Sequence, residues 1–232
     1  MNAADQFDEI AKSYDDELRR SLGAAGNDIE IFARYKVKTL HQIINKSGKS
    51  IGSILEFGCG TGRNLVHLSE YFGDCALFGC DVSEESLAVA EYVVPSVKYQ
   101  AIHTPQSLVD TYRELDLVFV CGVFHHIPTN EHQKWMDGLH ATLKKGGILV
   151  LFEHNPFNPL SNYIFRHSKI DEGAVMVKPS SLCELVQNAG FCNSKLRYTL
   201  FFLWRSRWLE AVEKGLFWLP LGAQYYVCCE KT

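Results

Sequence analysis

Short runs of apolar residues alternate with segments in which apolar residues recur every three or four positions, from about residue 51 onward. The runs are typical of buried strands, and the wider spacing is typical of helices that cover a sheet. Strands are predicted at residues 54–57, 76–80, 97–102, 115–121, 148–152, 195–203 and 224–229. Helices are predicted at about residues 28–46, 61–72, 131–144, 180–189 and 208–217, with another starting at Ser83.

Strand and helix alternate five times before the last two strands, which predicts an α/β fold built on a parallel sheet. Residues 1–50 contain no strand pattern and are expected to form a helical N-terminal cap. Residues 51–232 are expected to form one domain. Within it, residues 154–178 interrupt the alternation with prolines and no clear strand, and they are the candidate lid.

Three glycines at alternate positions, Gly58, Gly60 and Gly62, follow the first predicted strand and precede a helix. Glycine lets a backbone turn with positive φ and approach a ligand without a Cβ in the way. Strand, turn and helix N-terminus together predict a nucleotide-binding crevice. Asp81 ends the second strand, where a carboxylate accepts hydrogen bonds from ribose hydroxyls. The dinucleotide fingerprint is G-x-G-x-x-G, so the tighter spacing and the preceding Glu56 argue against a nicotinamide-dependent oxidoreductase.

Composition narrows the classes of partner. The chain has 232 residues, 47% of them hydrophobic, and a net charge of −4, which suits one soluble α/β domain. An acidic balance without a basic block disfavours a nucleic-acid partner. The sequence contains no transmembrane-length apolar run, and its acidic N-terminus does not resemble a signal peptide. The eight cysteines have no C-x-x-C spacing, which predicts reduced thiols in a cytoplasmic protein and no metal centre.

Four motifs, in order, resemble those of the class I S-adenosylmethionine-dependent methyltransferases. They are L-E-F-G-C-G-T-G at residues 55–62, G-C-D-V-S at 79–83, D-L-V at 116–118 leading to F-H-H-I at 124–127, and L-K-K-G-G at 143–147. The resemblance covers roughly residues 50–153. The F-D-x-x-A-x-x-Y-D pattern at residues 7–15 is similar to the N-terminal segment of the small-molecule branch of that family.

The resemblance implies S-adenosyl-L-methionine as the cofactor and a doubly wound, mostly parallel seven-stranded sheet in the order 3-2-1-4-5-7-6, with the last strand antiparallel. It implies that the glycine turn faces the methionine portion, that Asp81 binds the ribose and that Val82 packs against the adenine. Tyr14 would close the pocket from the cap. His103 and Thr104 stand where the family often has an acidic residue. The implied cofactor-binding set is Tyr14, Glu56, Gly58, Gly60, Gly62, Asn64, Asp81, Val82, His103, Thr104, Cys121, Gly122 and Phe124.

Three residues, His125, His126 and Glu153, are candidates for catalysis. The two histidines follow the fourth strand, and near neutral pH a histidine can take a proton from a hydroxyl or amine nucleophile. Alternatively, they cap the loop through backbone hydrogen bonds. Glu153 and His154 end the fifth strand and face the same crevice, where the carboxylate either contacts substrate or structures the lid. Base catalysis is not obligatory, because methyl transfer from a sulfonium depends mainly on in-line alignment and desolvation.

Asn155-Pro156-Phe157 resembles the N-P-P-Y motif of DNA amino-methyltransferases. In that family the motif follows strand four, whereas here it follows strand five, so we do not interpret it as that motif.

These observations predict methyl transfer to an oxygen or nitrogen of a small molecule, such as a sugar, a phenol, a quinone or a lipid-linked acceptor. One alternative is an RNA or protein methyltransferase, which the acidic balance disfavours. The others are a nicotinamide-dependent oxidoreductase and a non-catalytic protein that keeps the pocket only for stability.

Aromatic and basic residues gather near the C-terminus. They are Trp204, Arg205, Arg207, Trp208, Phe217 and Trp218. Such a segment can form an interfacial patch that makes weak membrane contact. A helix face that covers the sheet or contacts another subunit is the favoured interpretation.

Overall fold

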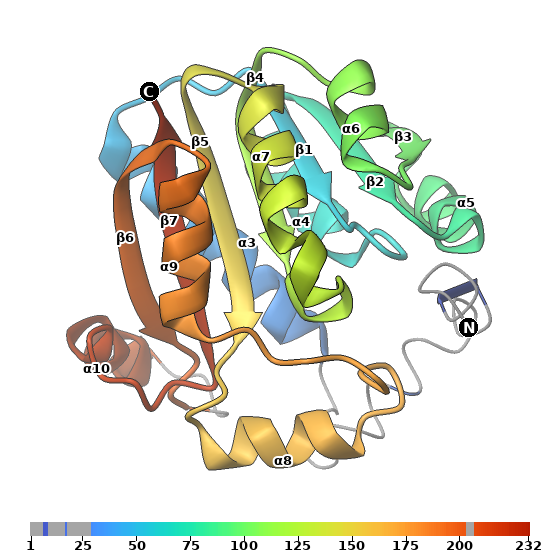
Figure 1. Ribbon diagram of the computed structural model, residues 1–232. Coiled ribbons are helices and arrows are strands. Elements are labelled where there is room, and N and C mark those ends of the chain that lie inside the picture. The colour runs from blue at the N-terminus through green and yellow to red at the C-terminus, as the bar shows by residue number, and fades with distance from the viewer. Residues whose placement is uncertain (1–6, 9–16, 18–28, 203–206) are drawn as a thin grey trace.

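The computed structural model describes residues 7–8, 17, 29–202 and 207–232. Its centre is a seven-stranded sheet in the order β3-β2-β1-β4-β5-β7-β6 (Figure 1). The strands are β1 (Ser53–Phe57), β2 (Ala76–Asp81), β3 (Lys98–Ala101), β4 (Leu115–Cys121), β5 (Leu143–His154), β6 (Phe191–Thr199) and β7 (Gln224–Lys231). β1 to β5 are parallel, and β7 is antiparallel to both β5 and β6. The predicted α/β class, strand order and antiparallel last strand are confirmed.

Helices cover both faces of the sheet (Figure 1). One face carries α3 (Ile29–Ser47), α4 (Arg63–Tyr71) and α5 (Glu84–Val93), and the other carries α6 (Pro105–Thr111), α7 (His132–Thr142) and α9 (Pro179–Asn188). In β4, Leu117 belongs to the same buried cluster as Leu40 in the first layer, whereas Val118 belongs to the cluster of Leu139 in the second. Successive strand residues point to opposite faces, so this central strand is buried on both sides and reads as a continuous apolar run.

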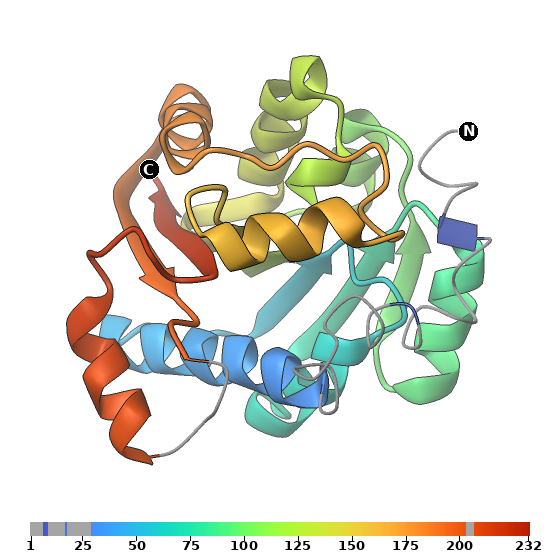
Figure 2. The ribbon, with the colours of Figure 1, turned by 90° about the horizontal axis from the view of Figure 1, so that it is seen from below.

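The carboxyl ends of the parallel strands meet at one edge of the sheet, where ligands bind in open α/β folds. α8 (Pro159–His167) crosses this edge between the two helical layers (Figure 2). Asn158 caps α8 by accepting a hydrogen bond from the backbone N–H of Ser161, and its Nδ2 donates to the carbonyl of Leu221 at 2.6 Å. The start of α8 is thereby attached to the loop that precedes β7.

The structure differs from the sequence prediction in three segments. Residues 105–111 form α6, which no apolar periodicity indicated; Thr104 and Ser107 cap it through reciprocal hydrogen bonds. β6 occupies Phe191–Thr199 rather than residues 195–203, because Leu200 has a φ of 60° and ends the extended chain. Residues 154–178, the candidate lid for which no element was predicted, contain α8.

The aromatic C-terminal segment includes α10 (Arg207–Leu216), while Trp204 and Arg205 lie outside the described residues. The guanidinium of Arg197 lies 3.5 Å from the ring centre of Phe217, and Trp218 is exposed. Membrane or subunit contact through this segment stays a prediction. No helix in the described part of the chain is long and apolar enough to span a membrane.

Candidate functional site

A cavity of about 320 Å³ lies at the carboxyl edge of the sheet. One end is bounded by the glycine turn after β1 and by the end of β2. The other end is bounded by side chains of α3, the loop after β4, the end of β5 and α8. A volume of this size is within the range of small-molecule pockets.

The glycine turn needs its glycines for two different reasons. Gly58 and Gly62 have φ values of 72° and 83°, and a Cβ on Gly58 would lie 2.3 Å from Cγ2 of Val123. A Cβ on Gly62 would lie 3.0 Å from Cβ of Ala90, so these two positions are required by packing. At Gly60 the φ is 51°, and no described atom lies within 4 Å of an added Cβ. Gly60 therefore borders the open space of the cavity.

Asp81, at the end of β2, is bound to this turn. Its Oδ2 accepts a hydrogen bond from the backbone N–H of Gly60 at 2.8 Å, and its Oδ1 accepts one from Ser83 at 3.0 Å. Burial raises the pKa of Asp81 although these N–H groups oppose the change. The hydroxyl of Ser83 donates to Asp8 at 2.5 Å, so Asp8 contacts the same corner of the site.

Glu56 lies behind the glycine turn and is completely buried. Its Oε1 accepts a hydrogen bond from Nδ2 of Asn64 at 2.7 Å, whereas its Oε2 has no partner among the described residues. Burial raises the pKa of Glu56 to about 8, against the opposing effects of Asn64 and of the charge of Lys36. A buried carboxyl group with one unsatisfied oxygen is suited to a ligand cation, which would ionise it on binding.

The remaining predicted cofactor residues fall into four groups. Val82, Cys121 and Gly122 line the cavity. The side chain of Phe124 lies in the apolar core, and His103 and Thr104 are exposed and not part of the lining, with Thr104 capping α6. Tyr14 lies outside the described residues. From the same N-terminal segment, Phe7 lines the cavity and meets the ring of His126 edge-on, with 4.9 Å between centroids.

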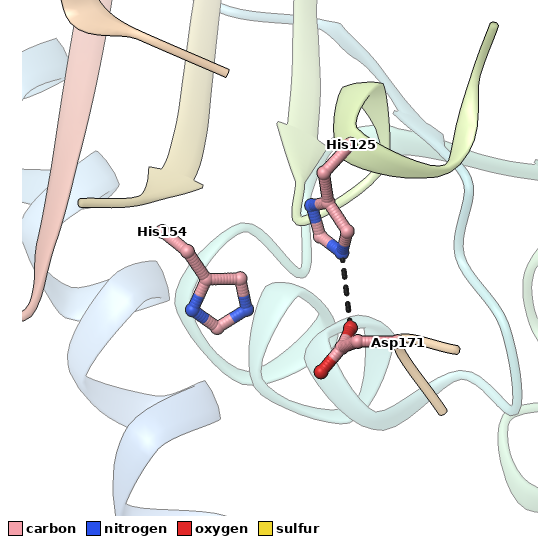
Figure 3. A group of neighbouring side chains, drawn as sticks. All are labelled: His125, His154 and Asp171. Atoms are coloured by element: carbon pink, nitrogen blue, oxygen red, sulfur yellow. Dashed lines mark ion pairs between the residues drawn. The ribbon is translucent and has the colours of Figure 1, made fainter. Parts of the chain in front are cut away.

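The three predicted catalytic residues are brought together. Nδ1 of His125 lies 2.7 Å from Oε2 of Glu153, and both side chains are buried. The other oxygen of Glu153 accepts the backbone N–H groups of Val123 and Phe124 at 3.1 and 2.8 Å. On its far side, Nε2 of His125 lies 3.3 Å from Oδ1 of Asp171 (Figure 3). Glu153 thus fixes both the backbone of the loop after β4 and the orientation of its histidine.

The histidines and carboxylates of this cluster differ in protonation state because burial and neighbouring charges shift their pKa values. Burial alone would lower the pKa of His125, but the charges and hydrogen bonds of Glu153 and Asp171 outweigh it and raise this pKa to about 9. Burial and the charge of His125 lower the pKa of His126 to about 3 and that of His154 to about 4. Despite burial, His125 lowers the pKa of Glu153 and holds that of Asp171 at about 2. At neutral pH one imidazolium therefore lies between two carboxylates.

The acceptor end of the cavity contains residues that the sequence analysis did not single out. Gln224 of β7 lines the cavity, and its Oε1 is buried without a partner among the described residues. Lys36 of α3 also lines the cavity, and its charge acts on both Glu56 and His154. The walls of the acceptor end are largely apolar and include Phe32, Ala33, Leu160, Ile164, Phe165, Ile170, Leu200 and Phe202. A polar residue among the apolar positions 32, 33, 37 and 40 is the signal that could have revealed Lys36.

Solved structures share this architecture. A S-adenosylmethionine-dependent methyltransferase of Thermotoga maritima, described as a possible histamine N-methyltransferase, superposes with a TM-score of 0.67 at 17% identity, with 100% of both chains covered. The magnesium protoporphyrin IX methyltransferase of Synechocystis PCC 6803, with bound S-adenosylhomocysteine, has a TM-score of 0.65 at 16% identity, with 97% of each chain covered. At these identities the likeness shows the fold.

Sequence comparison adds a domain match. Residues 55–149 match the model of a methyltransferase domain. The chain therefore contains a segment similar to methyltransferase domains, on the fold that the solved S-adenosylmethionine-dependent methyltransferases share. An uncharacterized methyltransferase of Bacillus cytotoxicus is 31% identical over 156 residues, which are 62% of this chain and 63% of the relative. An uncharacterized methyltransferase of Bacillus mycoides is 29% identical over 153 residues, with the same coverage. The match thus spans less than two thirds of the length of these curated relatives.

The methyltransferase domain and the class I fold that the four motifs predicted are therefore confirmed. This leaves the nicotinamide-dependent alternative without support. The roles of individual site residues stay predictions.

Proposed function

We propose that this methyltransferase binds S-adenosyl-L-methionine at the glycine turn and methylates an oxygen or nitrogen of a small, largely apolar acceptor. The observation that carries this proposal is one continuous cavity that joins the turn and Asp81 to an apolar chamber lined by His125, whose ring the buried Glu153 contacts from outside the lining. Residues 1–50 and 154–178 would act as cap and lid of this chamber.

The cofactor end fits the group that the family uses. Asp81 offers carboxylate oxygens to ribose hydroxyls, and Gly60 leaves open space beside them. The unpartnered Oε2 of Glu56 would receive the ammonium group of the methionine portion. S-adenosylmethionine supplies a methyl group activated by the adjacent sulfonium.

The acceptor end favours a small molecule over a macromolecule. α8 and α3 bound this part of the cavity, and its lining includes Leu160, Ile164 and Phe165. Such an enclosure excludes water, which strengthens electrostatic interactions and keeps the nucleophile poorly solvated. The net charge of −4 gives no attraction for RNA.

His125, His126 and Asp171 would have different roles toward the acceptor and its proton. His125 is an imidazolium at neutral pH, with both ring nitrogens protonated, so it would donate a hydrogen bond and orient the acceptor. Beside it, Nε2 of His126 lies 3.6 Å from Oδ1 of Asp171. The neutral ring of His126 and the ionised carboxylate of Asp171 are the groups that would accept the acceptor's proton. Alignment of the acceptor with the methyl group contributes the larger part of the rate enhancement.

The test has two parts. Isothermal titration with S-adenosylhomocysteine is expected to show one site on the full chain. Incubation with methyl-labelled cofactor and a panel of phenols, quinones, sugars and amines is then expected to label an apolar hydroxyl or amine compound. Absence of cofactor binding would reject the proposal, and label transfer to RNA or protein with none to small molecules would reject the acceptor class.

A further inference from the structure

Three side chains from separate segments converge beside the acceptor chamber (Figure 3). His125 follows β4, His154 ends β5 and Asp171 follows α8. One ligand atom from each lies within 4.8 Å of the others. The 3.3 Å between Nε2 of His125 and Oδ1 of Asp171 matches the separation of about 3.4 Å between two ligands bound at about 2.0–2.1 Å to a tetrahedral zinc ion. A small movement of the third ligand would complete the set.

Glu153 supplies the outer support that metal-binding histidines usually have. Such a histidine commonly donates its second ring N–H to a carboxylate, which fixes the tautomer and increases ligand basicity. Nδ1 of His125 is 2.7 Å from Glu153, whose other oxygen is held by two backbone N–H groups. The arrangement therefore directs Nε2 of His125 toward Asp171 and the cavity.

Carboxylates lie on both sides of His125, where a cation would be bound. Oε2 of Glu153 is 2.7 Å from Nδ1, and Oδ1 of Asp171 is 3.3 Å from Nε2. Lys36 of α3 lines the same cavity and offsets part of their negative charge.

We propose that Nε2 of His125, His154 and Asp171 bind a divalent transition-metal ion, Zn²⁺ by their ligand chemistry, with Glu153 as the orienting partner. Two imidazoles and one carboxylate form a ligand set that is used in catalytic zinc sites and leaves a fourth position for water or substrate. All three ligands line the cavity, so that position opens toward the acceptor chamber. Binding displaces the proton from Nε2 of His125. Given the methyl transfer proposed above, the ion would take over the roles of His125 and Asp171 in the metal-bound form: it would bind an acceptor hydroxyl and lower its pKa.

Sequence analysis predicted no metal centre because it looked for ligands at short, regular spacing. The three ligands are 29 and 17 residues apart along the chain, and the sheet and α8 bring them together. The prediction of no metal thus rested on a pattern that this kind of site does not have.

The experiment uses the full chain after dialysis against a chelator. Titration with Co²⁺ is expected to give the intense visible absorption of a four-coordinate site at one equivalent, and Zn²⁺ should abolish it. Glu153→Gln should weaken Co²⁺ binding about 10–100-fold, as loss of an outer partner commonly does. Asp171→Asn and His154→Gln should weaken it at least as much. His167→Ala, at an exposed histidine outside the cluster, is the matched control and should bind Co²⁺ normally.

S-adenosylhomocysteine titration of every variant reports whether it has folded and tests cofactor binding separately from metal binding. X-ray absorption of the zinc-loaded wild-type protein needs no variant and should show two imidazole ligands. The proposal is overturned if the wild-type protein gives no such spectrum. Binding unaffected by Asp171→Asn and His154→Gln, or zinc without two imidazoles, would overturn it equally.

Discussion

Nδ1 of His125 lies 2.7 Å from Oε2 of Glu153, and this contact joins the ends of two adjacent strands, β4 and β5. Because Glu153 also accepts the backbone N–H groups of Val123 and Phe124, one buried carboxylate determines the path of the loop. The pair combines structural and electrostatic roles, since the same contact raises the pKa of His125.

Replacing Glu153 by Gln is expected to lower the pKa of His125 from about 9 toward its ordinary value of 6.5. The amide can still accept the backbone N–H groups, but it removes the charge that favours the imidazolium. Breaking a buried ion pair should also lower the free energy of unfolding by about 3–5 kcal/mol. A histidine-detected NMR titration measures the pKa, and urea unfolding measures the stability.

The pH dependence of unfolding gives an independent check on this pair. His125 has a folded-state pKa above that of the unfolded chain, so its contribution to stability is complete below pH 6.5 and is lost as pH rises through about 9. Glu153→Gln should flatten this part of the profile, whereas Glu131→Gln at an exposed position should not. Identical profiles for Glu153→Gln and wild type would contradict the assigned charge state.

Asp81→Ala should weaken S-adenosylhomocysteine binding by about 1–3 kcal/mol, the usual loss when hydrogen bonds to a charged group are removed. Part of this loss would come through Gly60, whose backbone N–H donates to the Asp81 carboxylate at 2.8 Å. Calorimetric titration measures the change, with Asp110→Ala on α6 as the control. Unchanged affinity in Asp81→Ala would remove this residue from the cofactor site.

Comparing Gly60→Ala with Gly48→Ala distinguishes a loss of cofactor binding from a loss of stability caused by backbone strain. Gly60 and Gly48 both have positive φ, 51° and 68°, and neither has a described atom within 4 Å of an added Cβ. Each alanine should therefore lower stability by about 1–2 kcal/mol through the left-handed backbone alone. Only Gly60 borders the cavity, so only Gly60→Ala should also weaken S-adenosylhomocysteine binding in calorimetry. Equal affinities for the two variants would show that the cofactor does not approach Gly60.

The sequence predicted the features that depend on local pattern. The run at residues 115–121 is apolar because β4 is buried on both faces. Glycines recur in the turn after β1 because positions 58 and 62 have positive φ. The proximity of His125 and Glu153 could also be expected, because parallel neighbours place their carboxyl ends at the same edge.

Features that depend on tertiary contacts could not be predicted in this way. Asp171 enters the cluster only because α8 crosses the sheet edge, a geometry with no periodic signature. Lys36 faces the cavity from a helix whose amphipathic pattern indicates burial of its apolar face but not the lining of a pocket. Of the lid side chains, Phe165 lines the cavity, whereas Phe157 and Tyr163 are exposed.

Asn155→Ala should destabilise the fold without direct effect on the chemistry. Its fully buried side chain donates from Nδ2 to the carbonyls of Gly222 and Pro220, at 2.7 and 3.1 Å, and accepts the N–H of Phe157. Leaving these buried groups without partners should lower the free energy of unfolding by about 1–3 kcal/mol. Urea unfolding would measure this, with the exposed Asn130→Ala as control. A change within a few tenths of a kcal/mol, about the size of a surface substitution, would show that the turn does not need this anchor.

Glu56→Gln is expected to raise stability at high pH and to weaken cofactor binding. The folded-state pKa of Glu56 is about 8, above its ordinary 4.5, so its contribution to stability is present below pH 4.5 and lost as pH rises through 8. Removing the buried charge should make the cofactor-free variant more stable than wild type at pH 9, by on the order of 3–5 kcal/mol. An ammonium group that pairs with Oε2 should ionise Glu56, so wild type should release a proton on binding S-adenosylhomocysteine at pH 7 and the variant should not. Calorimetry in two buffers of different ionisation enthalpy measures that proton, and equal release by both proteins would place the ammonium elsewhere.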